Sequence, residues 1–318
     1  MENLAVTVVR KTMEAVDIVS FELARVDGKP LPAFSAGSHI DVQVPGGFTR
    51  QYSLCNDPRD QHRYRIAVLR DPASRGGSIG MHDAVNEGDV LHISAPRNHF
   101  PLQQARHTLL IAGGIGVTPL LCMAQRMDAA GNDFTLHYCT RSMERCAFRE
   151  EIAASGFAGR VNFHVDAGEP AQQLDLHTLL AKPDAETHIY VCGPGGFIDH
   201  VVGTAKASGW SSGQVHVEYF GAAPQDTSGD GSFEVKLAST GKIYPIAAGI
   251  SVTEALKACG IEILTSCEQG VCGTCITRVL DGEPDHRDMY FTDEEHAKND
   301  QFTPCCSRSK SALLVLDL

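Results

Sequence analysis

The feature that most constrains this chain is a group of cysteines toward its C-terminal end. Cys267, Cys272 and Cys275 are separated by four and then two residues, and Cys305 follows after 29 more. A [2Fe–2S] cluster needs four thiolates around two irons, and one tight loop can supply three of them while a separate segment brings the fourth. The spacing therefore predicts an iron–sulfur site whose ligands are these four cysteines.

Two other interpretations of the cysteines stay open on the residues alone. The thiols could form a structural zinc site or remain as buried free cysteines, but zinc sites usually pair one Cys-x2-Cys with a second, and this sequence has a single one. Cys306 adjoins Cys305, so chemistry does not decide the fourth ligand, and the spacing favours Cys305. Small residues whose amides are suited to donate hydrogen bonds to sulfur lie in the cysteine loop: Gly270, Gly273 and Thr274.

Residues 1–103 have the pattern of an antiparallel β-structure. Short apolar stretches alternate with turns that contain glycine and proline. Many short strands at regular spacing are typical of a barrel or sandwich, and we expect a barrel here. The expected strands cover residues 6–9, 18–23, 39–44, 64–69 and 90–94.

Residues 104–224 show a different pattern, in which continuous apolar strands alternate with helical stretches. This alternation predicts an α/β domain with a parallel sheet. The expected elements are strands 108–112, 133–139, 161–165 and 187–192 and a helix over 119–130.

Residues 225–232 are polar and contain glycine, which indicates a linker. Residues 233–318 then form a small α+β segment. Its expected elements are a hairpin over 233–237 and 242–246, a helix over 252–258 and a last strand over 313–318.

Two segments of the first region are suited to hold a flavin. Arg50, Tyr52 and Ser53 lie at the start of an expected strand, where Arg50 and Tyr52 share one face and Ser53 points to the other. A guanidinium can grip a phosphate, a tyrosine ring can lie against a flavin, and a hydroxyl can reach the flavin nitrogen that receives hydride. The alternative is an ordinary barrel strand with a buried tyrosine and a surface arginine.

The second of these segments contains Gly76 and Gly77, with Ser78 expected as the N-cap of a helix. Free amides at a helix start form a natural anion site, so Arg50 and this segment would hold one phosphate from two sides. A plain glycine turn is the alternative.

The second region carries a glycine-rich segment between a strand and a helix. Gly113, Gly114 and Gly116 would let the backbone approach a pyrophosphate, and Pro119, just after Thr118, suits the first turn of a helix. The segment departs from the usual dinucleotide fingerprint, because proline occupies the place of the third glycine. The expected cofactor is nevertheless a nicotinamide dinucleotide.

The residues alone do not decide between NADH and NADPH. No acidic residue ends the next strand, which finishes with Thr140 and Arg141. Arg141 could accept a 2′-phosphate or simply cap the strand, and Asp166 could meet a ribose hydroxyl or be an ordinary loop residue.

These motifs occur in the order found in one known family. The C-terminal segment resembles a plant-type ferredoxin, and the whole chain resembles the phthalate dioxygenase reductase family, whose vanillate O-demethylase reductases are the nearest members. The resemblance covers essentially all 318 residues.

The resemblance implies FMN, NADH and a [2Fe–2S] cluster as cofactors, with FAD as the alternative flavin. It implies that Arg50 and Ser78 contact the flavin phosphate and that Tyr52 and Ser53 contact the ring system. It also implies that the segment Cys192-Gly193-Pro194 lines the nicotinamide pocket. An aromatic residue that covers the flavin and moves aside for nicotinamide would be Phe220, or the adjacent Tyr219.

Charge and composition exclude several classes of function. The net charge of −12 argues against nucleic acid or an anionic membrane as a partner, and no apolar run reaches the ~18–20 residues of a membrane span. The first residues do not form a secretory signal, so the 11 cysteines are expected to be thiols or metal ligands in a cytoplasmic protein.

Taken together, the motifs predict a monomeric reductase that passes electrons from NADH through flavin and cluster to a separate protein. We expect no oxygen-activating site of two histidines and a carboxylate in this chain. We also expect residues 285–288 to form a surface loop. The resemblance implies a terminal Rieske oxygenase that demethylates vanillate or dihydroxylates phthalate. A carnitine-type or non-Rieske acceptor is the alternative, and a non-enzymatic binding protein would leave the motifs unexplained.

Overall fold

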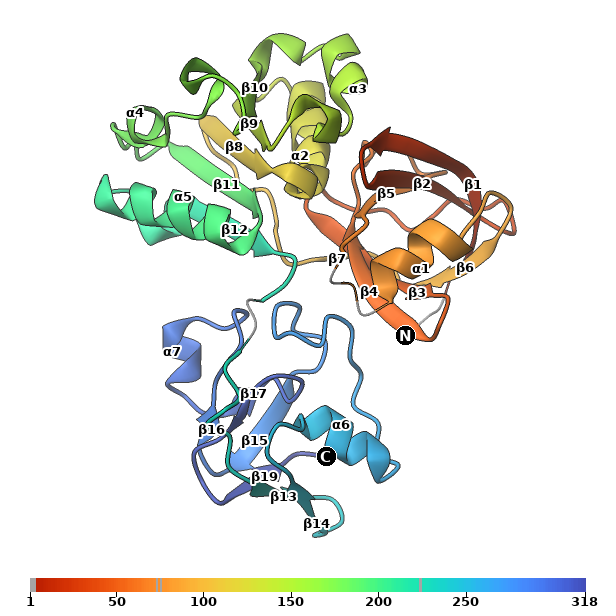
Figure 1. The fold of residues 1–318 in the computed structure, drawn as a ribbon, viewed down its shortest axis with the longest axis vertical. Helices are drawn as coiled ribbons and strands as arrows, with labels where there is room; N and C mark the ends of the chain where they lie inside the picture. Colours follow the sequence, from red (N-terminus) through yellow and green to blue (C-terminus); the bar gives the residue numbers. More distant parts are fainter. Residues whose placement is uncertain (1–3, 73, 75, 223–224) are drawn as a thin grey trace. The chain divides into compact units, whose positions relative to one another are not determined.

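The structure is a computed structural model that describes residues 4–72, 74, 76–222 and 225–318. The chain divides into two compact units, Met1–Glu218 and Tyr219–Leu318. Figure 1 shows the first unit as two sheets with their helices, and the second as a smaller sheet with two short helices.

The first sheet curls into an antiparallel barrel, as the sequence predicts. Its strand order is β4-β3-β6-β1-β2-β5, with β7 beside β3, and its interior is filled by side chains such as Phe21, Ile40 and Ile66. Helix α1 (Gly77–Ala84) follows the fifth strand. The strands are β1 (Leu4–Ala15), β2 (Ile18–Arg25), β3 (Ser38–Val44), β4 (Phe48–Ser53), β5 (Tyr64–Leu69), β6 (Val90–Ile93) and β7 (Arg97–Asn98).

One local expectation in this sheet is wrong. Arg50 and Ser53 were expected at the start of a strand, but Ser53 is the last residue of β4. The strand starts earlier because Gly46 and Gly47, with φ of 96° and 83°, form a tight turn that pairs Phe48 with Val44. Ser53 therefore lies at the edge where β4 leaves the sheet.

The second sheet of the first unit has the strand order β10-β9-β8-β11-β12, and β8 pairs in parallel with both β9 and β11. The chain order reverses between β8 and β11, and open α/β sheets bind ligands outside the carboxyl ends of strands at such a point. The strands are β8 (His107–Gly113), β9 (Asp133–Thr140), β10 (Val161–Val165), β11 (Thr187–Gly193) and β12 (Val215–Tyr219), the last of which was not expected.

Four helices accompany the strands of this sheet: α2 (Val117–Ala130), α3 (Arg149–Ala154), α4 (Leu176–Leu180) and α5 (Gly195–Ala207). Single 3₁₀ turns cover Gly114–Gly116, Met143–Arg145, Ala158–Arg160, Pro170–Gln172 and Ser212–Gln214. Among the residues that the structure describes, no helix is long and apolar enough to cross a bilayer.

The second unit is built on the sheet β14-β13-β19-β15-β17, whose first and last strands in the chain, β13 and β19, pair in parallel. Leu256 on helix α6 (Val252–Ala258) packs with Val235 and Leu314 in its core, and the Ser251 hydroxyl caps that helix by accepting from the Glu254 amide. The other elements are β13 (Phe233–Leu237), β14 (Ile243–Ile246), β15 (Thr277–Asp281), β16 (Pro284–Asp285), α7 (Asp293–His296), β17 (Gln301–Phe302), β18 (Arg308–Ser309) and β19 (Leu313–Leu316).

Candidate functional site

The side chain of Arg50 lies directly over the start of helix α1. A Cβ placed on Gly77 would lie 2.8 Å from the Arg50 Nε, so only glycine leaves room for the guanidinium there. Gly76, with φ of 110°, caps the helix without a side-chain hydrogen bond, and the Arg50 guanidinium also lies 5.2 Å from the centre of the Phe48 ring. The strand and the helix start thus bring a cation and free amides to one place, which suits a phosphate.

Ser78 is not the N-cap of this helix, so that expectation is wrong. Gly76 occupies the cap because its left-handed backbone makes the turn, and Ser78 falls in the first helical turn. The Ser78 hydroxyl accepts a hydrogen bond of 3.1 Å from the amide of Asp71. It therefore holds the preceding loop, and within the part of the chain that the structure describes no acceptor is recorded for its own proton, which would suit an anion.

Ser53 pairs with a residue that the sequence analysis missed. The buried Ser53 hydroxyl lies 3.3 Å from a carboxylate oxygen of Glu218, at the end of β12. Burial raises the pKa of the Glu218 carboxyl to about 8, and the hydrogen bond from Ser53 opposes this rise. Burial likewise raises the pKa of the neighbouring Tyr52, a half-buried residue packed against the barrel core. No signal near Glu218 in the sequence marks this pair.

The glycine-rich segment after β8 packs directly against the end of β11. A Cβ on Gly116 would lie 2.2 Å from the carbonyl oxygen of Cys192, and one on Gly193 would lie 3.0 Å from the Cα of Gly113. Both segments follow neighbouring parallel strands, since Ala112 pairs with Cys192. The structure thus joins two of the sequence motifs at the reversal point of the sheet, where open α/β sheets bind their ligands.

The other residues of this motif are held inside the loop. Helix α2 begins at Val117, so Pro119 lies in its first turn as expected. The buried Thr118 hydroxyl donates to the carbonyl oxygen of Ile115, 3.0 Å away, and Gly114 has a φ of 54°. These contacts fix the shape of the loop that is predicted to bind the pyrophosphate of the dinucleotide.

Residues at the carboxyl end of β9 lie next to this loop in the sheet order. The Thr140 carbonyl accepts from the Asp166 amide at 2.9 Å, and its hydroxyl donates to the Ser142 carbonyl at 3.1 Å. Arg141 is exposed at the same strand end. An exposed guanidinium and a loop aspartate are thus available here, and their roles toward the cofactor stay predictions.

Cys192 is fully buried, and its burial, with a contribution from Glu218, raises the pKa of its thiol well above the ordinary range. The thiol is therefore neutral and serves to pack and exclude water, since thiolate is the nucleophilic form. Phe220, just after β12, has 42% of its surface exposed, while Tyr219 ends the strand and is half-buried.

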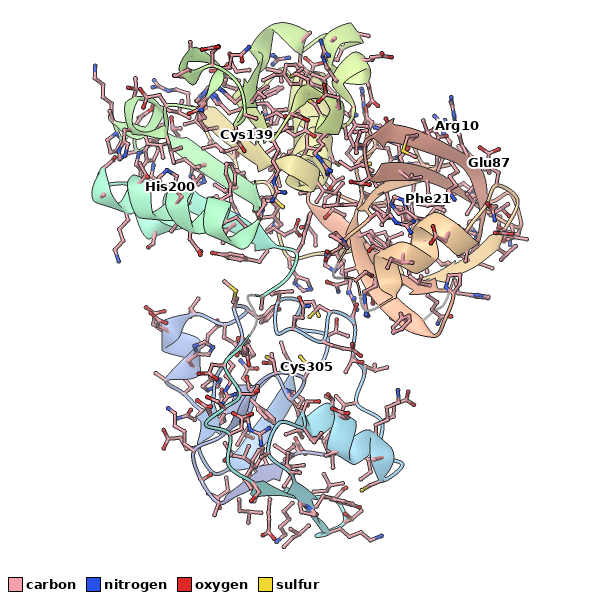
Figure 2. All side chains as sticks on the ribbon, viewed as in Figure 1. Arg10, Phe21, Glu87, Cys139, His200 and Cys305 are labelled. Atoms are coloured by element: carbon pink, nitrogen blue, oxygen red, sulfur yellow. The ribbon has the colours of Figure 1, made fainter. Side chains whose placement is uncertain are left out.

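The four predicted ligand cysteines converge in the second unit. The Cys267 thiol interacts with those of Cys272 and Cys305, and the Cys305 thiol also interacts with that of Cys275. Figure 2 shows Cys305 beside other sulfur atoms of this unit. The Cys272 and Cys305 thiols hold the pKa of Cys267 well below its ordinary range, so a thiolate is favoured in the group.

The surrounding backbone fits a cluster held by this donor set. The Gln269 amide points at the Cys267 sulfur from 3.4 Å, and the Thr274 amide donates to the Cys272 sulfur from 3.5 Å, as expected for Thr274. A Cβ on Gly270 (φ 73°) would lie 2.4 Å from the Cys306 sulfur, and one on Gly273 (φ 68°) 2.5 Å from the Tyr290 ring. The loop therefore needs glycine at both positions.

The geometry separates Cys305 from Cys306. Cys305 interacts with two of the other ligand cysteines, whereas the Cys306 sulfur lies 3.2 Å from the Thr303 hydroxyl and 3.8 Å from that of Ser307. Cys306 is thus engaged by its own turn, which favours Cys305 as the fourth ligand.

Gln269, inside the cysteine loop, is a second residue that the sequence analysis missed. Its side-chain oxygen accepts a 3.2 Å hydrogen bond from the Ala222 amide, and a Cβ on Gly221 would lie 2.7 Å from that oxygen. The segment after β12 is therefore fastened to the cysteine loop.

Comparisons with known proteins agree with this geometry. Residues 235–310 match a family described as 2Fe-2S iron-sulfur cluster binding domain, and residues 97–215 match the N-terminal domain of a dimethylamine monooxygenase subunit DmmA-like family. The chain is 58% identical to a vanillate O-demethylase oxidoreductase of Pseudomonas putida, over 98% of both chains. It is 43% identical to a phthalate dioxygenase reductase of Burkholderia cepacia, over 99% of this chain and 97% of that one.

A solved structure of phthalate dioxygenase reductase, described as modular and as transferring electrons from pyridine nucleotides to [2Fe-2S], also matches. It superimposes with a TM-score of 0.79 at 42% identity, over 99% of this chain and 98% of that one.

Proposed function

Because the chain belongs to the phthalate dioxygenase reductase family, we propose that it moves electrons from NADH through FMN and a [2Fe–2S] cluster to the Rieske centre of a separate terminal oxygenase. The observation that carries this proposal is the convergence of Cys267, Cys272, Cys275 and Cys305 in a chain that also has the two cofactor sites of the first unit.

The chemistry explains why three sites occur together. Nicotinamide releases two electrons as a hydride, a cluster accepts one at a time, and a flavin can exchange either number. Within the protein, the Arg50 guanidinium and the amides at the start of α1 bind the flavin phosphate. Ser53, whose hydroxyl donates to Glu218, would contact the flavin ring system near the nitrogen that receives hydride.

Cys192 and the glycines of the second motif shape the nicotinamide pocket. The Cys192 thiol is fully buried, while Gly113, Gly116 and Gly193 let the two strand ends pack closely together, so that their backbone would meet the dinucleotide as one surface. Phe220, or alternatively Tyr219, would be the aromatic residue that covers the flavin in the absence of nicotinamide. At the cluster, amides such as that of Thr274 tune the potential by donating to sulfur.

The partner we infer is an oxygenase component that demethylates vanillate. Identity to the vanillate O-demethylase oxidoreductase is 58%, against 43% to the phthalate dioxygenase reductase, which favours a methoxy-aromatic acid over phthalate. A carnitine-type or non-Rieske oxygenase is the alternative acceptor. The 11 cysteines are expected to be thiols or cluster ligands, which fits a cytoplasmic location, and small electron-transfer contacts fit a monomer.

The test begins with an anaerobic visible spectrum of the purified protein before and after NADH. Flavin and cluster absorption should both bleach, and chromatography of the released flavin should give FMN and not FAD. The reduced protein is then mixed with purified oxygenase components of vanillate O-demethylase and of phthalate dioxygenase. Faster reoxidation by the first, with product formed from vanillate, supports the proposal. Flavin that bleaches alone, or failure to reduce any Rieske oxygenase, overturns it.

A further inference from the structure

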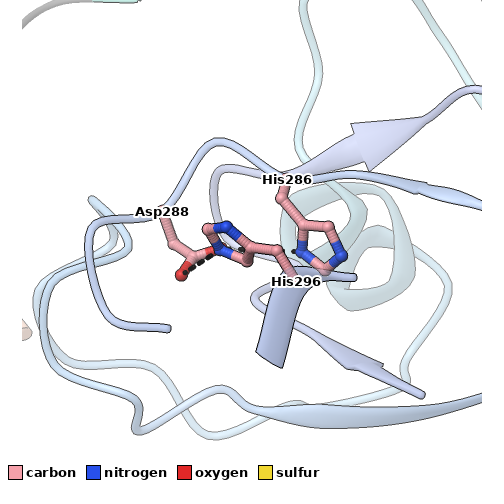
Figure 3. Close-up of side chains that lie close together, drawn as sticks. All are labelled: His286, Asp288 and His296. Atoms are coloured by element: carbon pink, nitrogen blue, oxygen red, sulfur yellow. Dashed lines mark hydrogen bonds and ion pairs between the residues drawn. The ribbon is translucent and has the colours of Figure 1, made fainter. Parts of the chain in front are cut away.

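Three side chains of the second unit form a potential metal-ligand group outside the cysteine loop. His286 and Asp288 follow β16, and His296 ends helix α7. One nitrogen of each histidine and an oxygen of Asp288 all lie within 4.8 Å of one another (Figure 3). From the sequence, a surface loop is expected at residues 285–288, and no oxygen-activating site of two histidines and a carboxylate is expected in the chain.

The group is partly buried, in a loop that was expected at the surface. The Asp288 side chain is fully buried, and those of His286 and His296 are 9% and 23% exposed. The amides of Tyr290 and Phe291 donate to Asp288 Oδ2 at 3.1 and 2.9 Å and fix the carboxylate. Among the described residues, the basic side chains nearest to this carboxylate are the two histidines, and a histidine is charged only when it is protonated. Neutral histidines would leave a buried carboxylate whose charge a cation can balance.

His286 has a nitrogen that lacks a hydrogen-bond partner. Its Nε2 lies 3.2 Å from Asn299 Oδ1, which can only accept, so Nε2 carries the proton and Nδ1 presents a lone pair. That buried Nδ1 has no hydrogen-bond partner among the described residues and faces Asp288 Oδ1 at 3.8 Å. Two acceptors that face each other are stabilised by a cation between them.

The contact to Asn299 is also the one that metal-bound histidines make. Such a histidine almost always donates its other ring N–H to a carbonyl or carboxylate, which sets its tautomer.

One of the ligand distances matches a tetrahedral site, and the others are longer. Metal–nitrogen bonds of about 2.0–2.1 Å imply ligand–ligand distances of about 3.3–3.4 Å. The Asp288 oxygens lie 3.2 Å from His296 Nε2 and 3.8 Å from His286 Nδ1. The two rings stack at 4.4 Å, so a bound ion requires them to rotate modestly until both nitrogens point to it. The partly exposed side of His296 leaves room for water as a fourth ligand.

We propose that His286, Asp288 and His296 bind one divalent transition-metal ion, with zinc the best match, as a structural clip beside the cluster loop. The Met289 amide donates to the Gly270 carbonyl at 3.0 Å, and a Cβ on Gly270 would lie 2.9 Å from that of Asp288. An ion at this site therefore fastens the segment that packs against the cysteine loop, and it does so with ligands other than cysteine.

The test uses the full protein with its cluster intact, because vacant cysteines also bind zinc. Protein with two irons per chain is incubated with zinc chloride, passed through a desalting column and analysed for zinc and iron. The wild type should retain about one zinc per two irons, with nitrogen and oxygen but no sulfur around zinc by X-ray absorption. His296→Gln and His286→Gln should lower zinc affinity by at least ~10-fold while iron content stays unchanged.

The matched control is His200→Gln, which removes an exposed histidine of helix α5 and should retain zinc like the wild type. Thermal bleaching of the cluster gives a second readout: zinc should raise the bleaching temperature of the wild type and the control, but not of His296→Gln. Equal zinc retention in the wild type and both ligand variants would overturn the proposal. So would sulfur ligation, loss of iron on zinc binding, or no zinc retention at all. None of these results depends on NADH or an oxygenase, so they are distinct from a failure of the proposed function.

Discussion

The Ser53 hydroxyl lies 3.3 Å from a carboxylate oxygen of Glu218, although the two residues are 165 positions apart. Ser53 ends a barrel strand, and Glu218 lies on β12 of the parallel sheet. The contact therefore joins the flavin barrel to the nicotinamide sheet, and it puts a carboxyl group with a pKa of about 8 next to the hydroxyl that the sequence assigns to the flavin.

Replacing Ser53 with alanine should slow flavin reduction by NADH. The hydroxyl is positioned by Glu218, and loss of a positioned proton-bearing group costs about 10²-fold or more. Anaerobic stopped-flow absorbance at saturating NADH measures this rate. Ser20→Ala is the matched control, because Ser20 donates to Glu14 in the same barrel, and it should react like the wild type. A Ser53→Ala rate within twofold of the wild type would contradict the assignment.

Glu218→Gln should change how stability depends on pH. The folded pKa of Glu218, about 8, lies above its ordinary value of 4.5, so its contribution to stability is complete below about 4.5 and is lost as pH rises through about 8. Between pH 6 and 9 the variant should therefore become more stable relative to the wild type, because glutamine cannot ionise. Urea unfolding across this range measures the difference. The control Glu150→Gln, at an exposed position, should show no such change of stability with pH. If the difference in stability between Glu218→Gln and the wild type did not vary with pH, Glu218 would not have a raised pKa.

Gly116→Ala should weaken the nicotinamide site. The new methyl would lie 2.2 Å from the Cys192 carbonyl oxygen, so the two strand ends must move apart at a cost of about 1–3 kcal/mol. The Km for NADH should rise and the unfolding free energy should fall. Gly203→Ala, on α5 with open space around its Cβ, should be neutral or slightly stabilising. An unchanged Km in Gly116→Ala would argue against this packing at the site.

Serine at position 305 should abolish the cluster, whereas serine at position 306 should keep it. Cys305 interacts with Cys267 and Cys275, and Cys306 is engaged by Thr303. Iron and acid-labile sulfide analysis of Cys305→Ser and Cys306→Ser, with the visible spectrum, decides between them. The reverse outcome would make Cys306 the fourth ligand.

Gln269→Ala should slow electron transfer from flavin to cluster without affecting flavin reduction. The variant loses the hydrogen bond that fastens the segment after β12 to the cysteine loop, a contact of about 0.5–1.5 kcal/mol. Multi-wavelength stopped-flow after rapid NADH mixing separates the two phases. Gln301→Ala, on β17 of the same unit, is the control. If the rate of cluster reduction were the same in Gln269→Ala and Gln301→Ala, this contact would not position the cluster loop.

Several features of the fold and site could be read from the sequence because they are local. Three cluster ligands lie within a few residues of one another, at Cys267, Cys272 and Cys275. The glycine-rich segment that predicts a dinucleotide site is equally short, from Gly113 to Gly116. In residues 1–103, apolar and polar side chains alternate along each expected strand, so one face of the strand must lie against a core. The barrel could therefore be predicted. The exact ends of strands and helices were harder to predict from the sequence. Strand β4 starts earlier than expected, and Gly76, not Ser78, caps helix α1.

Other relationships were decided only by tertiary packing. Ser53 meets Glu218, Gln269 meets Ala222, and His286 meets His296 through the way separate strands and loops fold back on one another. No residue in these pairs carries a spacing that marks it, because side chains distant in sequence become neighbours only when their elements pack. The sequence by itself determined the classes of cofactor that this protein can hold, a flavin, a nicotinamide dinucleotide and an iron–sulfur cluster. The tertiary structure decided which polar groups lie at these sites, since burial and partner choice are properties of the packed chain.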